Sequence, residues 1–142
     1  MGPGVVGTGT ELGTTAVEVA PALDAVEAVG GIGILCVRAS DSDTRDRHRG
    51  ISHHTRTAAR LCRSTPYVVD VPSGAASLPG TRELQISQPI EPIALMARHN
   101  LAVTTMGRSV EQDPVFFAAA ASAGAAAAQL LNGRANTAIA AP

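Results

Sequence analysis

Lysine is absent from this sequence, and all eleven of its basic residues are arginines. No amine side chain is therefore available as a nucleophile, which excludes Schiff-base chemistry, a Ser–Lys catalytic pair and the lysine of a phosphate-binding P-loop. Positive and negative charges nearly balance, with a formal net charge of −1. Because no overall field attracts a polyanion or an anionic bilayer, we predict neither a nucleic acid nor a membrane as a partner.

Aromatic residues and cysteines are also scarce. Only 2% of the residues are aromatic while 45% are hydrophobic, so the core must be built from valine, isoleucine, leucine and alanine. Cys36 and Cys62 are too few and too widely spaced for a zinc knuckle or a Cys-x-x-Cys redox motif. The first residues lack the basic and then apolar segments of a signal peptide, and we therefore expect a cytoplasmic protein.

Apolar periodicity predicts helices that alternate with short buried strands. Pro21 should kink the first helix or mark its true first turn, and Ser52 offers an N-cap to the second helix. In the third helix, Ile93 and Met96 are expected to face inward. The expected helices cover 15–29, 53–62, part of 89–100 and 114–131, and the expected strands cover 32–37, 66–71, 82–87 and 101–105.

The last helix carries the clearest signals. Asp113 is expected to cap it, and Pro114 occupies the first helical position, where its missing N–H group costs nothing. Asn132 and Gly133 should end it. Its apolar residues are mostly alanine, which gains little from lipid, so we do not expect a transmembrane helix. Residues 133–142 are expected to form a disordered tail.

Strands alternating with helices indicate a single α/β domain over residues 1–132. We expect a three-layer, Rossmann-like arrangement around a mainly parallel sheet of three to four strands. The polar loops that follow strands 32–37 and 101–105 then lie at strand carboxyl ends, the edge at which open α/β sheets bind ligands.

The amino-terminal residues form a glycine-rich loop. Residues 2–7 match G-x-G-x-x-G, but the preceding strand and the acidic residue at the end of the next strand are missing, so dinucleotide binding is weakly indicated. The loop could instead cradle an anion with its backbone N–H groups and hydroxyls, or it could be a flexible terminus. The candidate ligands are Gly4, Gly7, Thr8, Gly9 and Thr10.

Residues 45–54 concentrate three of the four histidines between an expected strand and an expected helix. Guanidinium groups grip phosphate or carboxylate in pairs, so Arg47, His48, Arg49 and Ser52 are candidate ligands for an anion. If Ser52 caps the helix, His53 and His54 lie in its first turn, where the helix dipole opposes protonation. A neutral histidine there could act as a general base. Gly107 and Arg108, after the expected strand 101–105, would complete the site, unless that loop is an ordinary connection.

Two other interpretations of the histidine-rich segment remain open. His48, His53 and His54, with Asp41, Asp43 or Asp46, could bind a metal ion. Against this, the neighbouring arginines disfavour a bare dication, and adjacent histidines on a helix usually point apart. The segment could also be a solvated loop whose Asp–Arg pairs contribute little.

Three stretches together resemble a bacterial family known as domain of unknown function 3866. They are the glycine loop 2–10, the Arg-His-Arg-Gly-Ile-Ser-His-His string at 47–54, and Thr-Met-Gly-Arg-Ser-Val-Glu-Gln-Asp-Pro-Val-Phe-Phe at 105–117. Their order and spacing also agree, and the resemblance covers residues 2–124. It implies that the chain corresponds to the carboxyl-terminal half of longer proteins, in which a strand leads into the glycine loop. It implies no reaction, since the family has no established activity.

The leading hypothesis from the sequence is therefore an anion site at the carboxyl edge of the sheet. The ligand would be a phosphorylated or otherwise anionic small molecule, with turnover and any cofactor left open. A metal-dependent hydrolase using His48, His53 and an aspartate is the first alternative, and a non-catalytic module or a truncated chain is the second. Self-association into a homo-oligomer is also open.

Overall fold

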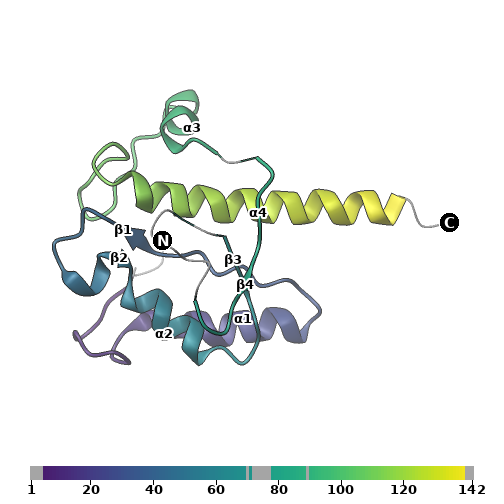
Figure 1. Ribbon diagram of the computed structural model, residues 1–142, viewed down its shortest axis with the longest axis horizontal. Coiled ribbons are helices and arrows are strands. Elements are labelled where there is room, and N and C mark those ends of the chain that lie inside the picture. Colours follow the sequence, from purple (N-terminus) through teal and green to yellow (C-terminus); the bar gives the residue numbers. More distant parts are fainter. Residues whose placement is uncertain (1–4, 70, 72–77, 89, 140–142) are drawn as a thin grey trace.

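The computed structural model describes residues 5–139 except 70, 72–77 and 89, with side chains described as far as residue 133. Figure 1 shows α1 and α2 on one side of the short central strands and α4 on the other side. The 3₁₀ helices are η1 (Thr15–Glu18) and η2 (Asp46–His48). The α-helices are α1 (Val19–Ala28), α2 (His53–Leu61), α3 (Pro92–Arg98) and α4 (Pro114–Ile139), and the strands are β1 (Ala39–Ser40), β2 (Gly50–Ile51), β3 (Tyr67–Val68) and β4 (Arg82–Glu83).

Mixed helix and strand content is confirmed, but a continuous Rossmann-like sheet is not found among the described residues. β3 and β4 pair in parallel, and Ile34 makes a parallel bridge to Tyr67, so the segments around the expected strands 32–37, 66–71 and 82–87 do lie in parallel order. β1 and β2 form a separate antiparallel pair. The predicted parallel sheet is therefore reduced to one short ladder.

The expected strand 101–105 is wrong. Leu101 and Val103 are 51% and 53% exposed, and the only pairing described within this segment is a bridge from Thr105 to Arg108. An apolar run becomes a strand only where a neighbouring strand and a covering layer are available. Here the chain leaves α3 through Asn100, at φ 51°, and no described strand lies alongside it.

The local signals at the starts of α1 and α2 are confirmed. Pro21 lies in the first turn of α1, after η1, and Gly30 follows the helix in the left-handed region at φ +75°. Ser52 caps α2, because its hydroxyl accepts a hydrogen bond from the N–H of His54. In α3, Met96 is buried as expected, whereas Ile93 is exposed, contrary to expectation.

α4 begins where the sequence predicts, but the role of Asp113 at its start and the position of its end differ from expectation. The helix starts at Pro114 as predicted, but the Asp113 carboxylate accepts hydrogen bonds from Ser40 and Arg108 and does not cap the helix. The expected end at Asn132 and Gly133 is wrong, because Gly133 does not adopt the left-handed conformation that terminates helices. Residues 133–139, expected to be disordered, are helical, and residues 140–142 lie outside the described part of the chain.

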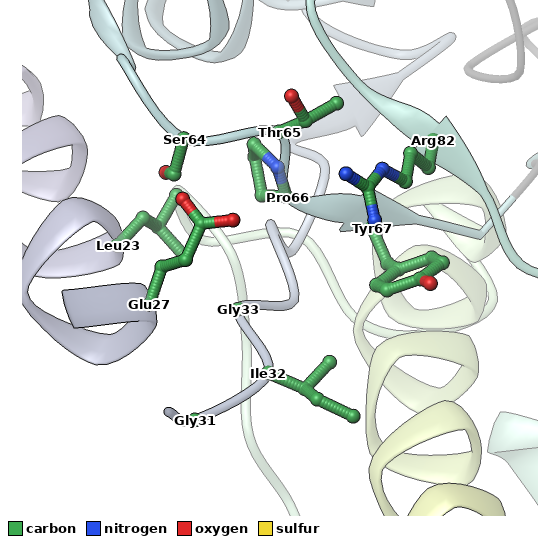
Figure 2. A pocket seen from close by; sticks show the side chains of 10 residues that line it. All are labelled: Leu23, Glu27, Gly31, Ile32, Gly33, Ser64, Thr65, Pro66, Tyr67 and Arg82. Atoms are coloured by element: carbon green, nitrogen blue, oxygen red, sulfur yellow. The ribbon is translucent and has the colours of Figure 1, made fainter. Parts of the chain in front are cut away.

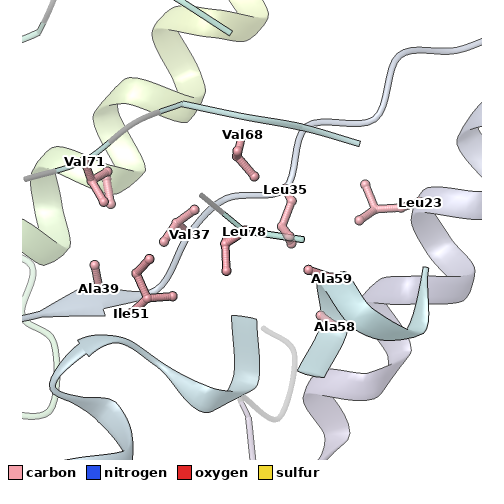
Figure 3. Close-up of a cluster of buried hydrophobic side chains, with 11 residues drawn as sticks. Leu23, Leu35, Val37, Ala39, Ile51, Ala58, Ala59, Val68, Val71 and Leu78 are labelled. Carbon is pink, nitrogen blue, oxygen red and sulfur yellow. The ribbon is translucent and has the colours of Figure 1, made fainter. Parts of the chain in front are cut away.

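The main core is aliphatic, as the low aromatic content requires. It packs α1, α2 and α4 against the central segments (Figure 3). Its buried residues are Leu23, Leu35, Val37, Ala39, Ile51, Ala58, Ala59, Val68, Val71, Leu78 and Ala119. A smaller cluster of Met96, Val110 and Phe117 joins α3 to the start of α4.

One described helical stretch, Pro114–Gly133, is long and apolar enough to cross a membrane by length and composition alone. Little of this stretch is buried in the structure. Since a core helix of a soluble protein passes the same test, the expectations of a cytoplasmic protein without a membrane partner stay predictions.

We expect Val68→Ala to lower the free energy of unfolding by about 2 kcal/mol, because it removes two methyl groups from a fully buried position. Val103→Ala is the matched control, and its exposed side chain should leave the value within about 0.5 kcal/mol of wild type. Urea unfolding of both variants measures the difference. Equal losses in the two variants would contradict this assignment of the core.

Candidate functional site

Three histidine rings meet between η2 and the first turn of α2. The centroid of His48 lies 4.9 Å from those of both His53 and His54, and the latter two centroids are 4.2 Å apart. One ring nitrogen from each residue lies within 4.8 Å of the other two. The expectation that His53 and His54 point apart is therefore wrong. At the first two positions of a helix no preceding turn separates the side chains, so both rings reach His48.

Hydrogen bonds determine the tautomer of His48, which is only 2% exposed. Its Nε2 accepts a hydrogen bond from Arg47 Nε at 3.3 Å, and a guanidinium can only donate. The neutral ring therefore carries its proton on Nδ1, which donates to the Ser52 hydroxyl at 2.8 Å. Ser52 thus caps α2 and orients His48 at the same time.

His53 and His54 each have one ring nitrogen without a hydrogen-bond partner among the described residues. These atoms are His53 Nε2 and His54 Nδ1, and both are buried. The second nitrogen of His54, Nε2, lies 3.3 Å from the hydroxyl of Thr14, the residue that caps η1. Thr14 was not singled out in the sequence, and only its place before a helical segment could have drawn attention to it.

Burial keeps all three histidines neutral. It is the main cause that lowers the pKa of His48 from 6.5 to about 4, and the positive charges of Arg45 and Arg38 add to it. Burial is also the main cause that lowers the pKa values of His53 and His54. The charge of Arg47 is the second cause for His53, and the charge of His53 is the second cause for His54. Neutral imidazoles keep a lone pair on one nitrogen, so the cluster offers electron-pair donors at physiological pH.

The buried carboxylate of Asp43 forms ion pairs with three nearby arginines. Arg45 donates from Nε to Oδ1 at 2.9 Å and from Nη2 to Oδ2 at 2.8 Å, and these bonds hold the pKa of Asp43 well below its usual range. Arg38 and Arg108 approach Oδ2 to 3.5 Å and 3.6 Å. Arg108 also donates to Asp113 at 3.0 Å. Arg108, predicted as an anion ligand, is thus engaged in internal ion pairs.

The glycine loop lies beside Arg47. Gly9 adopts φ +87°, and a Cβ atom built on it would stand 3.5 Å from Arg47 Nη1. The hydroxyls of Thr8 and Thr10 are 3.0 Å apart, and both bond to Gly13, through its carbonyl and its N–H respectively. The loop therefore satisfies much of its own hydrogen bonding.

The remaining predicted ligands are less closely gathered. Gly7 bridges to Thr14, which brings it near the histidines. Arg49 is exposed, and Gly107 forms the tip of the turn between Thr105 and Arg108. Gly4 lies outside the described residues. The ligand and base roles of all these residues stay predictions.

A separate hollow of about 140 Å³ lies away from the histidines, between α1 and the start of β3. Figure 2 shows Glu27 and Arg82 on opposite sides of it, with Pro66 between them. It contains none of the residues predicted for the site.

Taken together, these features define a small mixed α/β protein with a three-histidine cluster, in which His48 is buried and His53 and His54 are half-buried. The chain matches the family described as "Protein of unknown function (DUF3866)" over residues 1–124, and it belongs to that family. The resemblance drawn from the three stretches is confirmed, but the match does not support the finer expectation of a carboxyl-terminal half. No curated protein and no solved structure matches the chain.

We expect the free energy of unfolding to fall as the pH is lowered from about 7 to about 5. The histidines bind protons below pH 6.5 when unfolded, whereas folded His48 resists protonation down to about pH 4. The unfolded state therefore gains protons across this window, and His48 alone should cost about 2 kcal/mol.

Urea unfolding at several pH values tests this expectation, with His99→Gln as a control that leaves the cluster intact. His54→Gln should weaken the dependence. Asp43 does not contribute in this window, because its folded pKa is depressed and its stabilisation is lost only as the pH falls below the ordinary aspartate value of 3.8. A wild-type stability that is flat between about pH 7 and about pH 5 would show that the rings are solvated.

Proposed function

We propose that the chain binds a divalent transition metal ion through His48, His53 and His54 and uses it to activate water for hydrolysis. The observation that carries this proposal is the convergence of three neutral imidazoles, one buried and two half-buried, with ligand atoms within 4.8 Å. It develops the metal-dependent hydrolase considered from the sequence. His54 replaces the expected aspartate, since Asp43 is already surrounded by guanidinium groups.

The hydrogen bonds select the ligand atoms. His48 offers Nε2, because its Nδ1 donates to Ser52, and His53 and His54 offer the nitrogens that lack partners, Nε2 and Nδ1. Metal-bound histidines commonly donate their second ring nitrogen to a neighbouring oxygen, and Ser52 and Thr14 supply such oxygens here. Zinc–nitrogen bonds of about 2.0–2.1 Å hold ligand nitrogens about 3.4 Å apart, so the rings would draw together on binding.

The sequence indicated that the neighbouring arginines would repel a metal cation, and the structure weakens this objection. Arg38, Arg45 and Arg108 all pair with Asp43, and Arg108 also pairs with Asp113, so two carboxylates offset two of the three positive charges. Arg47 has no carboxylate partner among the described residues. It would move from His48 Nε2 when a metal occupies that lone pair.

Three histidine ligands leave a fourth position for water, as in catalytic zinc sites. A metal ion held by the three histidines would lower the pKa of a water in that position to about 7 and would supply a hydroxide nucleophile. Arg47, beside the cluster, would bind a negatively charged group of the substrate.

We expect one equivalent of Zn²⁺ or Co²⁺ to bind the chelator-treated protein. His53→Ala and His54→Ala should each lower the affinity by at least about 100-fold, because each removes a ligand. Thr14→Val should lower it about 10-fold by freeing the His54 ring. Isothermal titration and the visible absorbance of bound Co²⁺ measure both effects, and His99→Ala is the control.

Hydrolysis of chromogenic phosphate and carboxylic esters, with and without metal, tests the catalytic step. Metal-dependent turnover that is lost in His53→Ala supports a hydrolase. A wild-type protein that stays folded and binds no metal would rule the proposal out.

The second candidate is the anion site that the sequence favoured, without a metal. Its support is the position of Arg47, an exposed guanidinium beside Gly9 of the glycine loop and in contact with His48. Arg49 is exposed on the same segment. His53 or His54 would act as a general base on a phosphorylated small molecule.

For this candidate, inorganic phosphate or a nucleotide should bind saturably to chelator-treated protein, and added salt should weaken the binding. Arg47→Ala should reduce the affinity at least about tenfold, because it removes a charged hydrogen-bond donor. Arg98→Ala, an exposed arginine on α3, should leave the affinity unchanged. Absence of phosphate binding, or equal weakening by both variants, would argue against the anion site.

A further inference from the structure

An apolar pocket of about 300 Å³ opens beside His54. Its walls come from four places: the segment before the Gly7–Thr14 bridge, η1 with the start of α1, the segment before β1, and α2. The apolar contribution includes Val5, Ala16, Val19, Ile34, Leu35 and Ala58. Two of these, Val5 and Val19, are themselves substantially exposed, so the apolar surface is open to solvent in the free protein.

The polar side chains of the lining are those of Arg38, His54 and Thr55, with the thiol of Cys36. Arg38 directs Nη2 to Asp43 at 3.5 Å, but its Nε is buried without a hydrogen-bond partner among the described residues. The Thr55 hydroxyl already accepts a hydrogen bond from the Arg38 backbone. His54 belongs both to the pocket and to the histidine cluster, so the two sites share a residue.

We propose that this pocket binds the aliphatic chain of an acyl group, with its carbonyl or carboxylate end at Arg38 and His54. An apolar cavity with few polar groups matches an amphipathic ligand, since the chain gains from burial and the head group is oriented by the cation. At about 30 Å³ for each water-sized group, the volume accommodates roughly ten non-hydrogen atoms. A medium-length chain, such as an octanoyl group, fits that volume.

This inference rests on the proposed hydrolase for its chemistry, and it names the substrate class as acyl esters. Hydroxide derived from one water adds to the acyl carbon, and the bond from that carbon to the ester oxygen breaks. The leaving alkoxide takes up the proton that the water gave up, and the carboxylic acid product releases its own proton to solvent. The carboxylate product keeps its chain in the pocket and its charge beside Arg38.

Cys36 provides a readout that requires neither metal nor turnover, because this residue is exposed and lines the same pocket. Burial around the sulfur raises its pKa, so alkylation is followed at mildly alkaline pH. In chelator-treated protein, octanoate should slow the alkylation of Cys36 at least about fivefold, whereas acetate should not. Cys62 lies outside the pocket and reports any general effect of the fatty acid.

A matched pair of variants tests the location. Val19→Phe adds bulk at a partly exposed pocket wall and should remove the protection by octanoate. Val29→Phe adds the same bulk at a side chain that is 85% exposed and outside the pocket, and it should retain the protection. With metal-loaded protein, kcat/KM for an octanoyl ester should exceed that for the acetyl ester at least about tenfold.

The possible failures are distinguishable. Protection of Cys36 in a protein that binds no metal would overturn the hydrolase and support the pocket as an acyl-binding site. Metal binding without protection of Cys36 by octanoate would support the metal centre and overturn the pocket. Equal protection in Val19→Phe and wild type would also overturn it.

Discussion

The buried carboxylate of Asp43 is the interaction on which the arrangement of this protein depends. A charge that is almost fully removed from water is costly unless it is paired and hydrogen-bonded. Arg45 satisfies it from its own loop, while Arg38 and Arg108 approach from the segment before β1 and the turn before α4. Asp113 then binds Arg108 and Ser40. Asp43 therefore links the histidine-bearing loop to the turn before α4, across more than sixty residues of sequence.

The same carboxylate shapes the histidine cluster. The positive charges of Arg45 and Arg38 still disfavour a protonated His48. Because these arginines pair with Asp43, part of their charge is offset near the place where a metal ion would bind. Ser52 adds a second constraint, because one hydroxyl both caps α2 and accepts the His48 proton. Neutral rings, a defined tautomer and paired arginines are separate effects. All three favour a site that donates electron pairs over one that carries positive charge.

Features that depend on a few neighbouring residues were predictable from the sequence. Ser52 as an N-cap, Pro21 in a first turn and the start of α4 at Pro114 follow from local geometry alone. The strand expected at 101–105 and the end of α4 were not predictable, because pairing partners and the conformation of Gly133 are tertiary properties. In the site, the sequence identified the three histidines but not their convergence. The roles of Asp113 and Thr14 required contacts 73 and 40 residues away.

Arg47 connects the two candidate functions, because both require a change at the same nitrogen. His48 Nε2 has one lone pair, which accepts a hydrogen bond from Arg47 in the present structure. A metal ion on that lone pair would displace the guanidinium, which lies beside Gly9 of the glycine loop. An anion held by Arg47 would likewise draw it from His48 and expose the ligand atom. Metal and anion would therefore favour each other's binding at this site, through competition for a single hydrogen bond and not through direct contact.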